Sequence, residues 1–153
     1  MLHVPTTEAR VPDHTRNSVN RKIRATTLKN LQACIDQDAQ AIDRRIAELR
    51  REWDIERTLE ANAAAVTVVG TILGFTRSRR FFALPGLVVG FLLQHAVQGW
   101  CPPLPVFRQM GIRTSAEIHS EILALRLLRG DFGDPPGTAE QALSLAEMRG
   151  GGR

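Results

Sequence analysis

The main pattern along the chain is a pair of uncharged apolar runs separated by a short basic turn. The first run covers residues 61–76 and the second residues 81–100, and charged segments flank both. As α-helices, sixteen and twenty residues span about 24 and 30 Å, close to the hydrocarbon thickness of about 30 Å. The pattern therefore predicts two transmembrane helices that form an antiparallel hairpin.

Apolar residues recur with helical spacing before the hairpin, over residues 18–60. They follow a seven-residue period with members three or four residues apart: Ala25, Leu28, Ile35, Ala39, Ile42, Ile46, Leu49 and Trp53. This spacing predicts one long amphipathic, coiled-coil-like helix. It is expected to pack on its own chain or on the membrane surface, with self-association as the alternative. Residues 1–17 have no apolar period and are expected to be disordered.

Two segments follow the hairpin. Residues 101–131 combine a stiff, extended Pro-rich exit, CPPLP, with a short amphipathic helix. Thr114 and Glu117 have capping-box spacing at the start of this helix, and Gly130 suits its end. The apolar face of the helix contains Ile118, Ile122 and Leu125. Residues 132–153 are expected to be a flexible tail, so the predicted fold is all-α.

Glycines within the two runs indicate close helix packing. They stand four residues apart in each run, at Gly70 and Gly74 and at Gly86 and Gly90. In lipid, glycines let two helix backbones approach closely. The predicted contacts lie between the two helices or between protomers. A homo-oligomer can therefore form through the glycine faces or through the N-terminal helix.

Residues typical of a membrane–water interface stand at the ends of the runs: Trp53, Arg77, Arg79, Arg80 and Trp100. The outer flanks contain seven arginines against three in the turn: Arg44, Arg45, Arg50, Arg51, Arg57, Arg108 and Arg113. Because positive charge favours the cytoplasmic side, both termini are expected in the cytoplasm. The expected location is the bacterial inner membrane, crossed twice.

The charge distribution argues against a nucleic-acid partner. The chain has 20 Lys and Arg against 16 Asp and Glu, a net charge of +4. Residues 10–29 carry six basic residues against one acid, whereas residues 36–60 carry eight acids against five arginines. A short basic segment of this kind suits anionic lipid headgroups. The expected partners are the lipid bilayer and a protein that the sequence does not identify.

Candidate chemistry is limited to a few polar residues near the end of the second run. His95 lies beside Gln94 and Gln98, and Cys101 follows at the water boundary. A hydrogen bond from His95 across the hairpin is the simplest role for the imidazole, with a proton relay or haem ligation as the alternative. Cys101 is a candidate reactive thiol.

No nucleophile motif, phosphate loop or metal spacing occurs in the sequence. We therefore expect no catalytic residue, no cofactor and no metal site. His119 and Glu121 are expected on a solvated helix surface.

Three short motifs carry a resemblance to a known family. They are Asp54-Ile55-Glu56-Arg57 before the first run, Gly99-Trp100-Cys101-Pro102 after the second, and Gly111-Ile112. With the apolar runs between them, residues 53–131 resemble the YgaP-like transmembrane domain, a small bacterial inner-membrane domain of unknown function that also forms the membrane tail of some rhodaneses. The resemblance implies a place in the membrane and no assigned activity. Compared with the family pattern, we expect this chain to add a long N-terminal helix and a C-terminal helix and to carry no rhodanese domain.

Three functions are compatible with the sequence. The first, which we favour, is a non-enzymatic hairpin that anchors or scaffolds in the membrane. The second is a small oligomeric transporter or channel in which Gln94, His95 and Gln98 line a path. The third is a membrane-associated thiol or sulfur-relay component that uses Cys101.

Overall fold

The computed structural model describes residues 9–35 and 37–150, and this part of the chain is helical throughout, with no β-strand. The helices form two compact units, each built from two stretches of chain. The hairpin unit contains residues 1–16 and 55–112, and the helical unit contains residues 17–54 and 113–153. The fold class is therefore all-α, as the sequence predicts.

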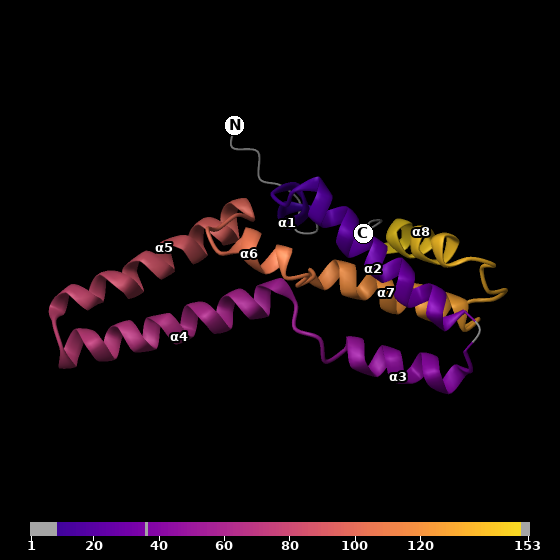
Figure 1. Ribbon diagram of the computed structural model, residues 1–153, viewed down its shortest axis with the longest axis horizontal. Helices are drawn as coiled ribbons and strands as arrows, with labels where there is room; N and C mark the ends of the chain where they lie inside the picture. Colours follow the sequence, from indigo (N-terminus) through magenta and orange to yellow (C-terminus); the bar gives the residue numbers. More distant parts are fainter. Residues whose placement is uncertain (1–8, 36, 151–153) are drawn as a thin grey trace. The chain divides into compact units, whose positions relative to one another are not determined.

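The hairpin unit is built on two antiparallel helices that lie side by side (Figure 1). The first arm of the hairpin is helix α4, Ile55–Thr76. The second arm is the 3₁₀ turn η1, Arg79–Phe82, followed by helix α5, Ala83–Gln98. Ser78 caps η1 by accepting a hydrogen bond from the Arg80 amide at 3.4 Å. Both Ile55–Thr76, with 22 residues, and Arg79–Gln98, with 20, are long and apolar enough to cross a membrane.

The open end of the hairpin is closed by two short helices, α1 at Arg10–Asp13 and α6 at Leu104–Gln109. A small core forms there from Val11, Ile55, Leu59, Cys101 and Leu104. Gly99 ends α5 with φ = 75°. A Cβ on Gly99 would lie 2.6 Å from the Arg10 Cβ, so only glycine allows this close approach.

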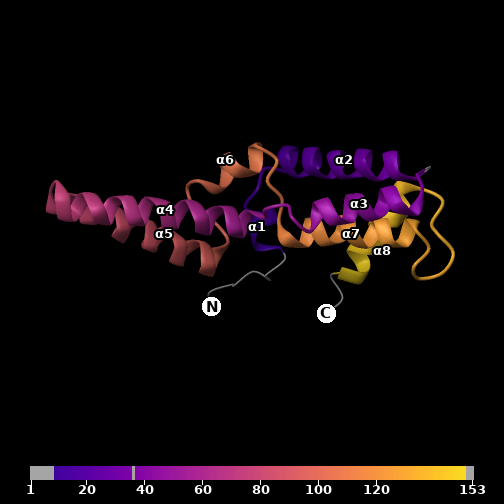
Figure 2. The same ribbon diagram turned by 90° about the horizontal axis from the view of Figure 1, so that it is seen from below.

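The helical unit consists of α2, Asn17–Cys34, α3, Ala39–Leu49, α7, Ser115–Leu128, and α8, Ala139–Gly150. Helix α7 contacts each of the other three (Figure 2). Its start has the predicted capping box, in which the Thr114 hydroxyl accepts from the Glu117 amide at 3.2 Å. The buried core residues are Leu31, Ile42, Ile46, Leu49, Ile118, Ala124, Leu125, Leu127, Ala139, Ala142, Leu143 and Ala146.

The predicted long helix over residues 18–60 is instead divided among α2, α3 and the first turn and a half of α4. Asp38 begins α3, because its carboxylate accepts a hydrogen bond from the Ala41 amide at 2.7 Å. A second break, over residues 50–54, separates α3 from α4. A heptad spacing survives such breaks when each piece still turns an apolar face to the same core, so the spacing does not reveal them.

The two terminal segments that were expected to lack structure, residues 1–17 and 132–153, contain helices. Residues 1–8 and 151–153 lie outside the described part of the chain, but α1 buries Val11 at 2% exposure. Helix α8 forms within the predicted tail and packs on α7 through four buried residues, Ala139, Ala142, Leu143 and Ala146. In the exit, α6 replaces extended chain after Pro103, since proline is well tolerated in the first turn of a helix.

Candidate functional site

A partly buried polar cluster lies at the base of the hairpin, where the first turn of α4 faces the last turn of α5. The Nε2 atom of His95 is 2.9 Å from the Oε2 atom of Glu56. The other Glu56 oxygen accepts a hydrogen bond from Arg10 at 2.8 Å, and Arg10 also donates to the Ala96 carbonyl at 3.1 Å. One carboxylate therefore joins α4 to α5 and to the segment that contains α1.

The imidazole of His95 has one satisfied and one unsatisfied nitrogen. Because an ionised carboxylate only accepts hydrogen bonds, the ring nitrogen facing Glu56 carries a proton. The other nitrogen, Nδ1, is buried and has no hydrogen-bond partner among the described residues. In the neutral ring this nitrogen is an acceptor that can take a proton. The sequence-based interpretation of His95 as a hydrogen-bonding residue across the hairpin agrees with this geometry.

Cys101 lies close to this histidine. Its side chain is 2% exposed and is near enough to the imidazole to interact with it electrostatically, although it makes no hydrogen bond to Nδ1. The arrangement of a thiol, an imidazole and a carboxylate is one that activates cysteine nucleophiles in other proteins. The structure therefore places a thiol beside an imidazole that already pairs with a carboxylate.

A cavity of about 270 Å³ borders Cys101. It lies among α4, α5 and α6, and its lining is apolar except for Asn62 and the thiol of Cys101. The residues that line it are Leu59, Asn62, Ala63, Val66, Val88, Phe91, Leu92, Cys101, Pro103 and Phe107. A small apolar molecule can occupy this space, whereas a charged one would lose its hydration there.

The other residues singled out from the sequence lie apart from this cluster. Gln94 is half-buried and Gln98 is exposed, and in the described part of the chain no hydrogen bond joins either amide to His95. Trp53 is half-exposed, Trp100 packs against the core at the hairpin base, and the turn arginines are exposed. Among the described residues no group of three or more potential metal ligands occurs.

The four glycines divide into two pairs. Gly70 and Gly74 are buried, and a Cβ on either would come within 3 Å of the returning chain, at Pro85 and Phe82 respectively. Gly86 and Gly90 are exposed, and an added Cβ would meet nothing within 4 Å. The first pair therefore lies in the contact between the two helices, and the second lies on the outer face of α5.

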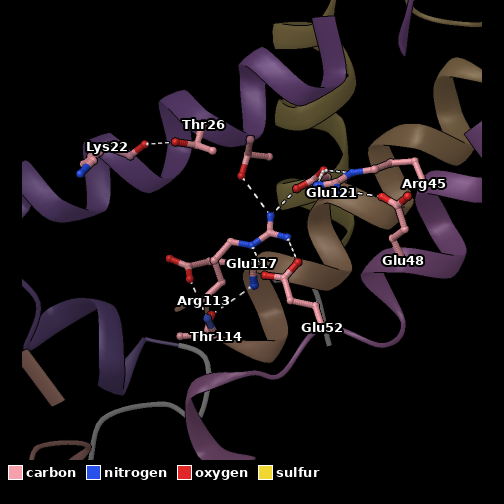
Figure 3. Close-up of polar contacts among 10 residues, drawn as sticks. Lys22, Thr26, Arg45, Glu48, Glu52, Arg113, Thr114, Glu117 and Glu121 are labelled. Carbon is pink, nitrogen blue, oxygen red and sulfur yellow. Dashed lines mark hydrogen bonds and ion pairs between the residues drawn. The ribbon is translucent and has the colours of Figure 1, made fainter. Parts of the chain in front are cut away.

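The helical unit contains a second buried polar cluster, shown in Figure 3. Glu121 on α7 is fully buried and accepts hydrogen bonds from Arg113 and, at 2.9 Å, from Arg45. Arg113 also forms a two-bond pair with Glu52, at 2.8 and 2.6 Å. Burial alone would lower the pKa of Arg113, but its bonds to Glu52 and its attraction to Glu121 raise the pKa above the ordinary value. Both arginines are therefore charged.

The structure corrects the expectation for Glu121 and places two of the predicted membrane-flanking arginines inside the protein. Glu121 is buried and paired rather than solvated, whereas His119 is exposed as expected. Arg108 and Arg113, counted among the membrane-flanking arginines, are 1% and 7% exposed and bond within the protein. The two arginines balance the charges of Glu121, which is fully buried, and Glu52, which is partly exposed, so the cluster joins α3, α7 and the adjoining loops.

Sequence reasoning missed Arg10 and Glu56 as members of the first cluster. A signal for Glu56 was present, because an antiparallel hairpin that turns at residues 77–80 places the start of α4 opposite the end of α5. No comparable signal marked Arg10, which is 86 residues from its hydrogen-bond partner Ala96.

No protein-family model, no curated protein and no solved structure matches this chain. The resemblance to the YgaP-like transmembrane domain therefore stays a prediction, and the function has to be inferred from the geometry.

Proposed function

We propose that this chain is an integral membrane protein whose hairpin anchors a folded helical unit to a bilayer. The observation that carries the proposal is the exposure of the two apolar helices. In the most apolar 18-residue window of each, 22% and 6% of the residues are buried. The large apolar side chains that α4 and α5 expose are Val66, Val68, Val69, Ile72, Phe75, Leu84, Leu87, Val89, Leu93 and Val97.

Three features support a lipid bilayer as the environment of this exposed apolar surface. The helical unit packs its apolar residues into a core and, against the ten on α4 and α5, exposes four large apolar side chains among its described residues: Trp53, Phe132, Leu145 and Met148. Helix α4, with 22 residues, is about 33 Å long, and its uncharged part, residues 61–76, spans about 24 Å, close to a hydrocarbon core of about 30 Å. Backbone groups in both helices are satisfied internally, as a lipid environment requires.

The proposal extends to a bacterial inner membrane, with two crossings and both termini in the cytoplasm. The short turn between the antiparallel helices supports an arrangement in which both chain ends lie on one side. Excluding the buried Arg108 and Arg113, five flanking arginines still outnumber the three in the turn. In this role the protein acts as a scaffold without catalytic activity.

Alkaline carbonate extraction of membranes from expressing cells tests the proposal. The wild-type chain should stay in the membrane pellet. Leu87→Arg should release part of the protein, because an arginine at mid-helix costs about 2.5–3.5 kcal/mol on insertion. Ser78→Arg, in the exposed turn, is the matched control and should remain in the pellet. Recovery of the wild-type chain in the supernatant would contradict the proposal.

A second function is favoured by the position of Cys101 beside His95. We infer that Cys101 is a reactive thiol for small apolar electrophiles that enter the adjacent cavity, with His95 as its proton acceptor. Methyl methanethiosulfonate should modify Cys101 in a Cys34→Ala background, and His95→Asn should slow this modification by about 100-fold.

Cys34 provides the control for this measurement. Burial raises the pKa of its thiol, and it belongs to the helical unit rather than to the hairpin unit. In a Cys101→Ala background, His95→Asn should leave the rate at Cys34 unchanged. An unchanged rate at Cys101 would remove the thiol function while leaving the anchoring function intact.

A further inference from the structure

Four arginines surround one cavity of the helical unit. The cavity has a volume of about 470 Å³ and lies between α3, the residues that follow it, and the end of α7. Its lining residues are Asp43, Ile46, Ala47, Arg50, Arg51, Arg126 and Arg129. Two arginines come from each side, and Ile46 and Ala47 form an apolar floor.

The charges in this arginine pocket are not balanced. Arg129 and Arg126 both bond to Asp131, with nitrogen–oxygen distances of 2.6 to 3.0 Å, and Arg129 also pairs with Asp43. Arg50 and Arg51 are exposed and form no ion pair with any described residue. Four positive charges therefore face two carboxylates, which leaves an excess of two.

Asp131, which is not a lining residue, shows how two arginines of the pocket interact with an oxyanion. The hydrogen bonds from Arg129 and Arg126 lower the pKa of this carboxyl to about 2. Arginines near the C-terminal ends of α3 and α7 also interact favourably with the helix dipoles. That effect does not balance the charges of Arg50 and Arg51, which remain available to a second anion.

We propose that the arginine pocket binds the phosphate group of an acidic phospholipid headgroup. Guanidinium groups match phosphate oxygens in paired hydrogen bonds, and the apolar floor suits the glycerol and upper acyl carbons. The lipid as the source rests on the proposed membrane function. It is supported by the sequence position of Arg50 and Arg51, five and four residues before α4 begins at Ile55. Basic residues beside a membrane helix are typical contacts of anionic headgroups.

The test uses the full chain in a zwitterionic detergent and short-chain phospholipids that dissolve as monomers. Binding of dihexanoyl phosphatidylglycerol is measured by titration calorimetry and compared with dihexanoyl phosphatidylcholine. The acidic lipid should bind about tenfold more tightly or better, because the choline group cancels the charge of the phosphate. Equal affinity for the two lipids would overturn the proposal.

Variants assign the binding to the pocket. Arg50→Gln with Arg51→Gln should weaken phosphatidylglycerol binding about tenfold or more. Arg77→Gln with Arg79→Gln removes the same charge from the exposed hairpin turn and should change the affinity less than about twofold. Asp43→Asn should tighten binding, because it removes one of the two negative charges that the arginines face, and a misfolded variant would not show this gain. Equal losses in the two double variants, or no gain from Asp43→Asn, would overturn the proposal.

Two further arms separate the source of the phosphate and the role of the membrane. Glycerol phosphate and inorganic phosphate should bind at least about tenfold more weakly than the lipid, since neither reaches the apolar floor. Equal binding would mean that the ligand is a soluble phosphate and would overturn the lipid assignment. Carbonate extraction reports independently on anchoring, so a chain that stays in the membrane without lipid selectivity loses only this inference.

Discussion

The position of Glu121 shows how one residue in an apolar face changes the energetics of a helix. Glu121 lies three residues after Ile118 and four before Leu125, so helical periodicity places it on the face that packs into the core. Removing a carboxylate from water is costly, and only close pairing with cations offsets that cost. Arg113, just before the start of α7, and Arg45, on α3, provide this pairing.

Replacing Glu121 should therefore destabilise the helical unit strongly. Glu121→Gln leaves Arg113 buried beside a neutral group and is expected to lower the free energy of unfolding by about 3–5 kcal/mol. Glu48→Gln is the control, because Glu48 is exposed and pairs only with Arg45 at 3.2 Å. It should cost less than about 1 kcal/mol. Hydrogen exchange of the α7 amides measures both, and equal small losses would contradict the buried-pair interpretation.

Gly99 allows a second prediction at the residue scale, with Gly111 as a matched control. Both glycines have positive φ, 75° and 89°, but only Gly99 has neighbours within 4 Å of an added Cβ. Gly111→Ala should cost about 1–2 kcal/mol, the penalty of a left-handed backbone for alanine.

Gly99→Ala should cost more, because the new methyl also collides with Arg10 and displaces it from Glu56. Limited proteolysis after Arg10 and Arg16 measures the release of this segment. Equal protection in the two variants would show that the contact between Gly99 and Arg10 contributes nothing to stability.

At the scale of elements, the hairpin is packed through one glycine pair and not through the other. Gly70 lies against Leu84 and Pro85, and Gly74 lies against Phe82, whose ring also packs edge-on against Phe75. Without a hydrophobic drive between helices in lipid, such close contacts are a main source of association. The outer glycines of α5 leave open the alternative of a contact with a second copy.

Gly70→Ile should therefore disrupt the hairpin, whereas Gly90→Ile should leave its internal packing unchanged. Thermal unfolding in detergent, followed by circular dichroism, should show a lower midpoint for the first variant only. Chemical crosslinking of the same samples reports on contacts between copies. A loss of crosslinked dimer in Gly90→Ile would support a protomer contact, and an unchanged midpoint in Gly70→Ile would contradict the described packing.

At the scale of the whole molecule, the helical unit is built from two separate stretches of the chain. The helical unit is formed by residues 17–54 and 113–153, with most of the hairpin unit inserted between them. In the proposed membrane arrangement, this insertion places both ends of the hairpin on the same side of the bilayer. The proposed orientation is therefore a property of the whole chain and can be tested with two residues.

Single cysteines at Ser78 and Ser115, in a background lacking Cys34 and Cys101, test that orientation. An impermeant maleimide applied to intact cells should label Ser78→Cys in the hairpin turn and leave Ser115→Cys at the start of α7 unlabelled. After permeabilisation both should react, which controls for access to the thiols. Labelling of Ser115→Cys alone in intact cells would show that the hairpin is inverted.

The sequence by itself determined the features that depend on neighbouring residues. The uncharged length of each run predicted two helices long enough to cross a membrane, and Thr114 and Gly130 predicted the start and end of α7. These features are local because helix formation, capping and chain length involve residues within one or a few turns. The helix boundaries within residues 18–60 could not be predicted, because the same apolar spacing fits one continuous helix or several consecutive helices.

Only the tertiary structure decided which polar side chains meet. Glu56 reaches His95 across 39 residues, Arg113 reaches Glu52 across 61, and Arg45 reaches Glu121 across 76. The arginine pocket likewise combines α3 with the end of α7. The type of a polar residue determines which groups could form a hydrogen bond or an ion pair with it. Its actual partner depends on how the helices pack. Burial then makes that pairing necessary, since an unpaired charge removed from water is strongly unfavourable.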